Sequence, residues 1–164
     1  MIQVVFLKNS IKTTVIFLIG FISSFIIFKL VGVSLEKTNS IDFGNSAMFF
    51  YILWNNIKVY FVLFLGLFLL KIPTYITLSY NAIILGFAFS ATDSFTILLS
   101  ILSHGILEIS AFIIASTIAF TKYDVVIENK KFMFIVFLIG IIILIIAAFI
   151  ETYVSPYIGN GGSF

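Results

Sequence analysis

The 164-residue sequence contains no cysteine and no arginine, only one histidine, and only 10% charged residues. Without cysteine, disulfides, thiol catalysis and thiolate metal sites are excluded. A soluble domain carries about a quarter charged residues, so this low charge excludes a water-soluble fold. The nine basic residues are all lysine and lie dispersed along the chain, which does not favour a nucleic-acid partner.

Long apolar runs take the place of charge, and 62% of the residues are hydrophobic. A helix needs about 17–25 residues to cross a bilayer. Five segments meet this requirement: residues 13–35, 56–72, 74–91, 95–120 and 132–153. No other region is large enough for a globular domain. We therefore expect one all-α, polytopic transmembrane domain in a lipid bilayer. The bias towards Ile, Phe, Lys and Asn is typical of an AT-rich bacterial genome, so we expect the domain in a bacterial cell membrane.

Four further features refine this organisation. Lys8 and Lys12 precede the first apolar run, but no signal-peptidase site follows it, so we interpret that run as a retained anchor. Pro73 separates the second and third spans and predicts a tight helical hairpin. The aromatic segment 47–54 is expected at the membrane interface. The fifth span has no polar centre and is expected to face lipid, followed by a mobile tail over 155–164.

The lysines predict the orientation of the chain, because cytoplasmic ends of spans are enriched in basic residues. With the N-terminus in the cytoplasm and the C-terminus outside, the inner side holds most of them. These are Lys8, Lys12, Lys71, Lys122, Lys130 and Lys131, against Lys29, Lys37 and Lys58 at or near the outer side.

His104 and Glu108 stand four residues apart, on one helical face, inside the fourth span. Ionisable groups are expensive in hydrocarbon, so the pair is a candidate for function. It could lock helices together, relay protons, bind a metal or act as a catalytic dyad. A zinc site needs three or four ligands, and no nucleophile motif accompanies the pair. A structural or conformational role is favoured, without a metal, a cofactor or a catalytic residue.

Polar residues in other spans predict partners for this pair. An amide in hydrocarbon usually bonds across helices, so Asn56 and Asn81 are expected to join His104 and Glu108 in an intramembrane polar centre. Lys58 has two equal interpretations, either as a lysine that snorkels to the interface or as the counter-ion of Glu108.

Small residues predict where the helices pack closely. Ala82, Gly86 and Ser90 recur every four residues in the third span. In the fourth span Gly105 and Ala111 accompany a polar stripe, which we expect to face the interior of the bundle. The stripe consists of Ser100, His104, Glu108, Ala111 and Ala115. Such rows also favour helix association, so an oligomer is compatible with the sequence.

Three of these motifs together resemble the stage II sporulation protein M-like family. They are His104-Gly105-Ile106-Leu107-Glu108 followed by Ala111, the pair Asn55-Asn56, and Asn81-Ala82-Ile83-Ile84-Leu85-Gly86. The resemblance covers residues 49–120 well, and it implies a five-span membrane protein without established enzymatic activity. The namesake works with two peptidoglycan-degrading partners during forespore engulfment. Related small proteins accompany ABC-type ATPases in gene clusters for circular bacteriocins.

The resemblance leaves two principal hypotheses. The first is a non-enzymatic scaffold that recruits membrane or envelope proteins to a machine such as one that remodels the cell wall. The alternative is a membrane component of a peptide maturation, export or immunity system that works with an ABC-type ATPase. An intramembrane hydrolase would be a third interpretation, and it would require a catalytic role for His104.

Overall fold

A computed structural model of the chain describes residues 2–33 and 45–159, and the described part is helical, without strands. The helices are α1 (Ile2–Val31), α2 (Ser46–Leu65), α3 (Ile72–Ser90), α4 (Phe95–Phe120), α5 (Tyr123–Glu128), α6 (Lys130–Tyr153) and α7 (Ser155–Gly159). Five of them, α1, α2, α3, α4 and α6, are long and apolar enough to cross a membrane. The prediction of an all-α, five-span membrane protein is confirmed.

Local sequence chemistry sets the hairpin of α2 and α3. The Asn45 side chain accepts a hydrogen bond from the Ala47 amide (2.9 Å) and caps the start of α2. Pro73 lies in the first turn of α3, where its fixed φ suits a helix. In the turn between them, Leu70 and Lys71 take left-handed backbone angles (φ 51° and 67°). The Thr74 hydroxyl then donates to the Leu63 carbonyl (2.7 Å), which ties the two helices together.

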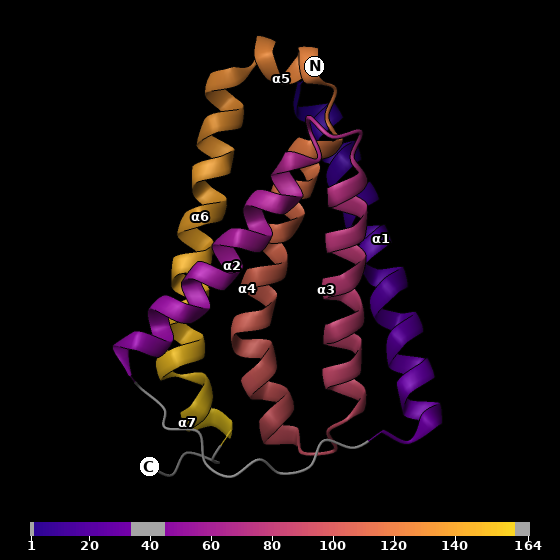
Figure 1. Ribbon diagram of the computed structural model, residues 1–164, viewed down its shortest axis with the longest axis vertical. Helices are drawn as coiled ribbons and strands as arrows, with labels where there is room; N and C mark the ends of the chain where they lie inside the picture. The colour runs from indigo at the N-terminus through magenta and orange to yellow at the C-terminus, as the bar shows by residue number, and fades with distance from the viewer. Residues whose placement is uncertain (1, 34–44, 160–164) are drawn as a thin grey trace.

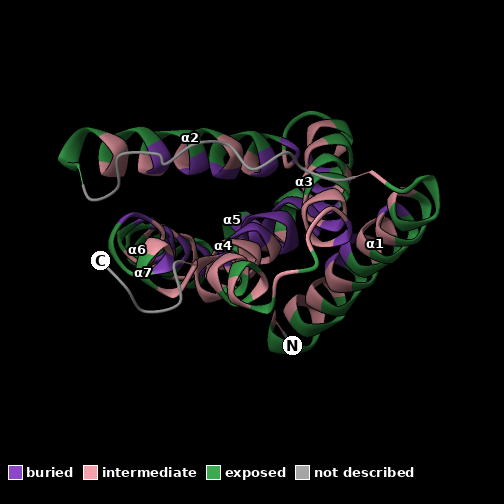
Figure 2. Cartoon of the chain, turned by 90° about the horizontal axis from the view of Figure 1, so that it is seen from below, coloured by how far each residue is buried: buried purple, intermediate pink, exposed green. Residues whose placement is uncertain are grey.

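The other long helices all contact α4, which lies between α6 and α3 in Figure 1, and α2 crosses the others obliquely. The start of α1 and the end of α7 lie at opposite ends of the bundle, which is the arrangement that five crossings require. Figure 2 shows the buried faces turned towards the centre of the bundle, and the core draws on all five long helices. Its buried residues are Phe17, Tyr60, Leu63, Leu78, Ala82, Ala111, Phe112, Ala115 and Leu144.

α1 and α3 pack closely through small residues. Ala82, Gly86 and Ser90 are buried in α3. A methyl group added at Gly20 would lie 3.0 Å from the Ala82 Cβ, and one at Gly86 would overlap Ser24 and lie 2.9 Å from the Phe25 amide nitrogen. The absence of side chains at these glycines therefore lets the two backbones approach.

The fifth span corrects one prediction. The expectation that it faces lipid is wrong for one side of α6, which packs along α4 and α2. Gly140 contacts the Tyr60 ring, and Leu144, Ala147 and Ala148 are fully buried. The prediction rested on the isoleucines of the apolar run. The small residues beside them let α6 pack against the other helices.

The helices differ from the predicted spans at several ends. The helix α1 begins at Ile2, so Lys8 and Lys12 lie within it, before the predicted first span. The aromatic segment 47–54 is the first half of α2 and no separate interfacial segment, so Asn56 lies mid-helix. The helix α6 begins at Lys130, just before the predicted fifth span, and the start of the predicted tail forms α7. Leu35, Lys37 and residues 160–164 lie outside the described residues.

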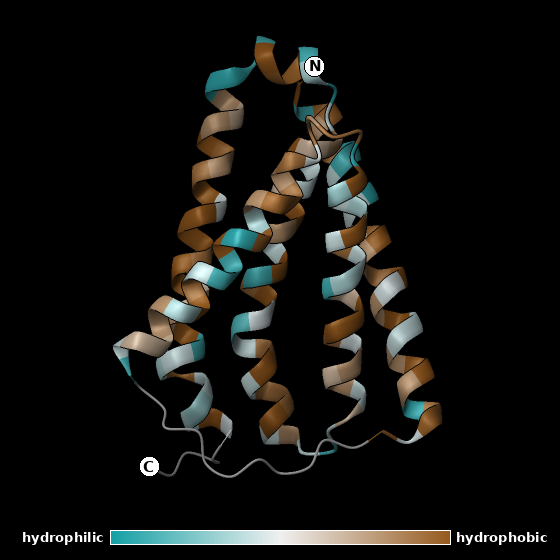
Figure 3. Cartoon of the chain, in the orientation of Figure 1, coloured by the Kyte–Doolittle hydropathy of each residue, from teal (hydrophilic) through white to brown (hydrophobic). Residues whose placement is uncertain are grey.

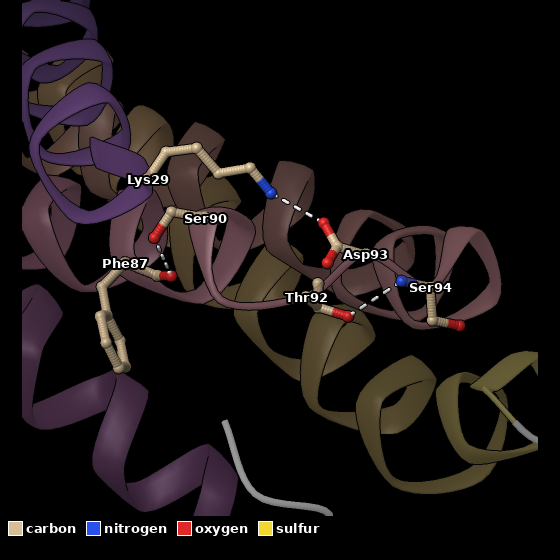
Figure 4. Close-up of polar contacts among 6 residues, drawn as sticks. All are labelled: Lys29, Phe87, Ser90, Thr92, Asp93 and Ser94. Atoms are coloured by element: carbon tan, nitrogen blue, oxygen red, sulfur yellow. Dashed lines mark hydrogen bonds and ion pairs between the residues drawn. The ribbon is translucent and has the colours of Figure 1, made fainter. Parts of the chain in front are cut away.

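Each end of the bundle has its own charge contacts. Where α1 ends, Lys29 donates to Asp93 in the turn between α3 and α4 (2.7 Å; Figure 4). This hydrogen bond with the Lys29 ammonium, and its positive charge, hold the pKa of Asp93 below its ordinary value. At the other end, Lys71 Nζ donates to the last carbonyl of α4, at Phe120 (2.8 Å), where a cation is favourable.

Candidate functional site

Polar side chains gather halfway along the bundle. Figure 3 shows hydrophilic stretches on α2, α3 and α4 at a similar height, between apolar ends. On α4, Ser100, His104 and Glu108 follow one another at four-residue spacing, and Ser103 stands beside them. All four are half-buried, and α6 and α7 pack on the same helix. The candidate site is therefore an intramembrane polar centre built on α4.

One hydrogen bond joins the centre of α2 to this stripe. Asn56 is buried, with 8% of its surface exposed, and its side-chain amide donates to a carboxylate oxygen of Glu108. Within hydrocarbon, an amide without a partner would be costly, so this bond favours one register of α2 against α4.

A second set of hydrogen bonds joins α7 to the stripe through Ser155. Its hydroxyl lies 2.9 Å from His104 Nδ1 and 2.7 Å from the Ser103 hydroxyl. Its carbonyl accepts a bond from the Ser100 hydroxyl (2.7 Å). Three polar side chains of α4, those of Ser100, Ser103 and His104, therefore hold the turn where α6 ends and α7 begins.

Glu151 is the site residue that sequence reasoning missed. It lies on α6, one turn before Ser155, and its carboxyl group faces His104 and Glu108 closely enough to act on both electrostatically. It also lies within hydrogen-bonding range of the Glu108 carboxyl group. A signal was present in the sequence, because Glu151 and Ser155 repeat the four-residue spacing of Ser100, His104 and Glu108.

Asn81 borders the same region from α3. Its amide donates to its own helix, to the Thr77 carbonyl (2.8 Å). The side chain lines a small pocket of about 120 Å³ together with Glu108 and Gly105, with Phe17 and Phe112 among the apolar walls. Asn81 thus shares a cavity with Glu108 without bonding to it in this structure.

Lys58 does not reach the centre. It is exposed on the face of α2 that points away from Asn56, and among the described residues Glu108 has no ion pair with it. A residue two positions along a helix is turned by about 200°, so Asn56 and Lys58 cannot both face α4. This structure therefore does not pair Lys58 with Glu108, and the ionisable group that acts on Glu108 is Glu151.

The arrangement contains a serine, a histidine and carboxylates, which are the elements of nucleophilic catalysis. However, Ser155 is only 3% exposed, and its hydroxyl already contacts Ser103 as well as His104. A substrate cannot reach this hydroxyl unless α7 moves. Within the described ranges, no three His, Asp or Glu side chains are grouped to hold a metal ion. The geometry suits cross-linking of helices better than chemistry on a substrate.

Two comparisons with known proteins find relatives of this chain. A sequence model described as "Stage II sporulation protein M" matches residues 13–156. An uncharacterized protein of Methanocaldococcus jannaschii is 34% identical over 173 aligned positions, which cover 92% of this chain and 95% of that relative. No solved structure matches the chain. The family match includes α1 after its first turns, the whole of α2 to α6 and the start of α7, so the polar centre lies entirely inside it.

Proposed function

Since this chain belongs to the stage II sporulation protein M family and has five helices able to cross a membrane, we propose that it is a non-enzymatic scaffold. Its role is to hold other membrane or envelope proteins of one machine together within the lipid bilayer. The described connections between its spanning helices are short, over residues 66–71, 91–94 and 121–129. Recognition of partners therefore falls mainly to the faces of the helices.

The outward face of α2 carries this proposal. Its exposed residues include Tyr51 (75% exposed), Trp54 (62%), Asn55 and Lys58. They recur at three- and four-residue spacing and so share one side of the helix. Asn55 and Lys58 lie near the middle of this 20-residue spanning helix, and neither has a partner among the described residues.

An amide and an ammonium group exposed to lipid at that depth are unfavourable by several kcal/mol, by order of magnitude. A partner helix that offers a carboxylate or an amide removes this cost, because it satisfies both groups by hydrogen bonding. The flanking aromatic rings then supply contact area. The polar centre on the opposite face of α2 supports this role, because the Asn56–Glu108 bond fixes the helix to the bundle.

Exchange of the polar groups for apolar ones tests the proposal. The variant Asn55→Leu with Lys58→Leu, purified in mild detergent from its native host, is expected to lose the partners that the unchanged chain retains. Its thermal stability is expected to be unchanged or higher, because both positions are exposed. Ile142→Ala with Ile146→Ala is the matched control, because it alters exposed residues on a different helix, α6, and should leave the partners in place.

Two outcomes would overturn the proposal. One is equal recovery of the same partners with the leucine variant. The other is recovery of the unchanged chain only as a free monomer from its native membrane. Retention of a complex that contains only copies of this chain would restrict the scaffold to self-assembly.

A further inference from the structure

An apolar pocket of about 310 Å³ lies at the end of the bundle that carries α5. α2, α4, α5 and α6 all contribute to its walls. α2 and α6 contact each other at mid-height, where Tyr60 meets Gly140, and they diverge towards this end (Figure 1). The volume is at the lower end of the range of about 300–1,000 Å³ for pockets that bind small molecules.

The pocket has a closed floor and an open side. Ile118, Val126 and Met133 form the floor and are at most 8% exposed. The rings of Phe64 and Phe137 stand next to each other as one wall, with centroids 4.9 Å apart.

The rim of the pocket is formed by Phe61, which is 46% exposed, and Phe134, which is 61% exposed. Both rings lie within membrane-spanning helices. The pocket therefore opens sideways to the hydrocarbon of the bilayer, and a molecule that enters it comes from the membrane.

Lysines stand directly above this opening. Lys130 precedes Phe134 by four residues, so it lies on the same face of α6, about 6 Å nearer the end of the bundle. Lys131 follows it, and both are exposed without an ion pair among the described residues. Glu128 lies beside them in the same surface hollow. In the described segments at this end, lysines outnumber acids by six to two: Lys8, Lys12, Lys71, Lys122, Lys130 and Lys131 against Asp124 and Glu128.

The volume of the pocket and the positive charge above its opening indicate which kind of molecule binds there. A single turn of helix with its side chains is a cylinder about 10 Å wide and 5.4 Å high, or about 400 Å³, so a partner helix does not fit inside. An extended hydrocarbon chain is much narrower than a helix, so part of one can lie in the pocket while the rest stays in the bilayer. We propose that this pocket holds one acyl chain of an anionic phospholipid, whose phosphate lies beside Lys130 and Lys131.

Fluorescence quenching tests the position of the acyl chain. The Trp54→Phe substitution first removes the only tryptophan of the chain. Phe134→Trp in that background then places a single indole at the rim. Phe149→Trp is the matched control, because Phe149 is similarly exposed (54%) on the same helix near its other end. The full chain in detergent micelles is titrated with phosphatidylglycerol that carries brominated acyl chains. We expect saturable quenching at position 134 at a few lipids per protein, and only weak, unsaturable quenching at 149.

Charge variants test the headgroup. Lys130→Gln with Lys131→Gln is expected to weaken phosphatidylglycerol binding by about 10- to 30-fold, since each lysine near an anionic headgroup contributes about fivefold. Binding of phosphatidylcholine with the same acyl chains should be weaker from the start and change little. Lys29→Gln, at the opposite end of the bundle, serves as the control and should change neither.

Inorganic phosphate and glycerol phosphate distinguish a lipid from a free anion. Neither is expected to compete at millimolar concentration, because the acyl chain supplies the contact with the pocket. Competition by either would overturn the assignment to a lipid. Equal quenching at positions 134 and 149, or equal binding of the two lipids to the unchanged chain, would also overturn it. This proposal is tested separately from the scaffold role, because its variants lie on α6, at Phe134, Lys130 and Lys131, and leave Asn55 and Lys58 of α2 unchanged.

Discussion

At the scale of single residues, the bond between Asn56 and Glu108 is the contact that joins α2 to α4 through polar groups. We expect a double-mutant cycle of Asn56→Ala and Glu108→Ala to give a coupling free energy of about 0.5–1.5 kcal/mol, the range for polar contacts between membrane helices. The measurement is the free energy of unfolding in micelles. The cycle of Asn81→Ala with Glu108→Ala is the control. Asn81 bonds to Thr77, so its coupling to Glu108 should be smaller, and a larger value would contradict the arrangement described here.

Two glycines differ in what surrounds them, although both lie in spanning helices. A Cβ at Gly140 would lie 2.7 Å from the Tyr60 Cζ atom, and Tyr60 is fully buried and donates to the Phe137 carbonyl (3.0 Å). At Gly105 the nearest atom would be the Leu85 Cδ1 at 4.0 Å. Gly140→Ala should therefore destabilise the fold by about 1–3 kcal/mol, whereas Gly105→Ala should be neutral. Thermal unfolding of both variants decides the matter, and equal losses would refute the predicted difference.

At the scale of elements, Ser155 fastens the short helix α7 to α4. Ser155→Ala removes the hydroxyl contacts to His104 and Ser103, at a cost of roughly 1 kcal/mol or about fivefold in local opening. Hydrogen exchange of the Ile158 amide, which bonds to the Val154 carbonyl, should become faster by about that factor. Ser110→Ala is the control, since in the described part of the chain Ser110 bonds only within α4, to Ile106. Unchanged exchange in the Ser155 variant would show that α7 is held by other contacts.

The sequence predicts the elements better than their ends. Apolar length alone identified five spans, because each must satisfy its backbone internally. The start of α2 was missed because residues 47–54 looked interfacial, although Asn45 and Ser46 form a recognisable helix start. Asn56 could be assigned to the polar centre because polar groups in hydrocarbon seek each other. Glu151 could not be matched to Glu108 in this way, since the distance between them depends on how α6 crosses α4, and the four-residue spacing of Glu151 and Ser155 indicates only a shared helix face.

At the scale of the whole molecule, the lysines sort to one end of the bundle. Among the described residues, six lie at the end that carries α5, and Lys29 lies at the other end. Positive charge is retained on the cytoplasmic side during insertion, so the α5 end should face the cytoplasm. The chain contains no cysteine, so single cysteines report sidedness without background. Asp93→Cys should react with a membrane-impermeant maleimide in intact cells, and Lys131→Cys should react only after permeabilisation. The reverse pattern would invert the topology and place the proposed lipid site in the outer leaflet.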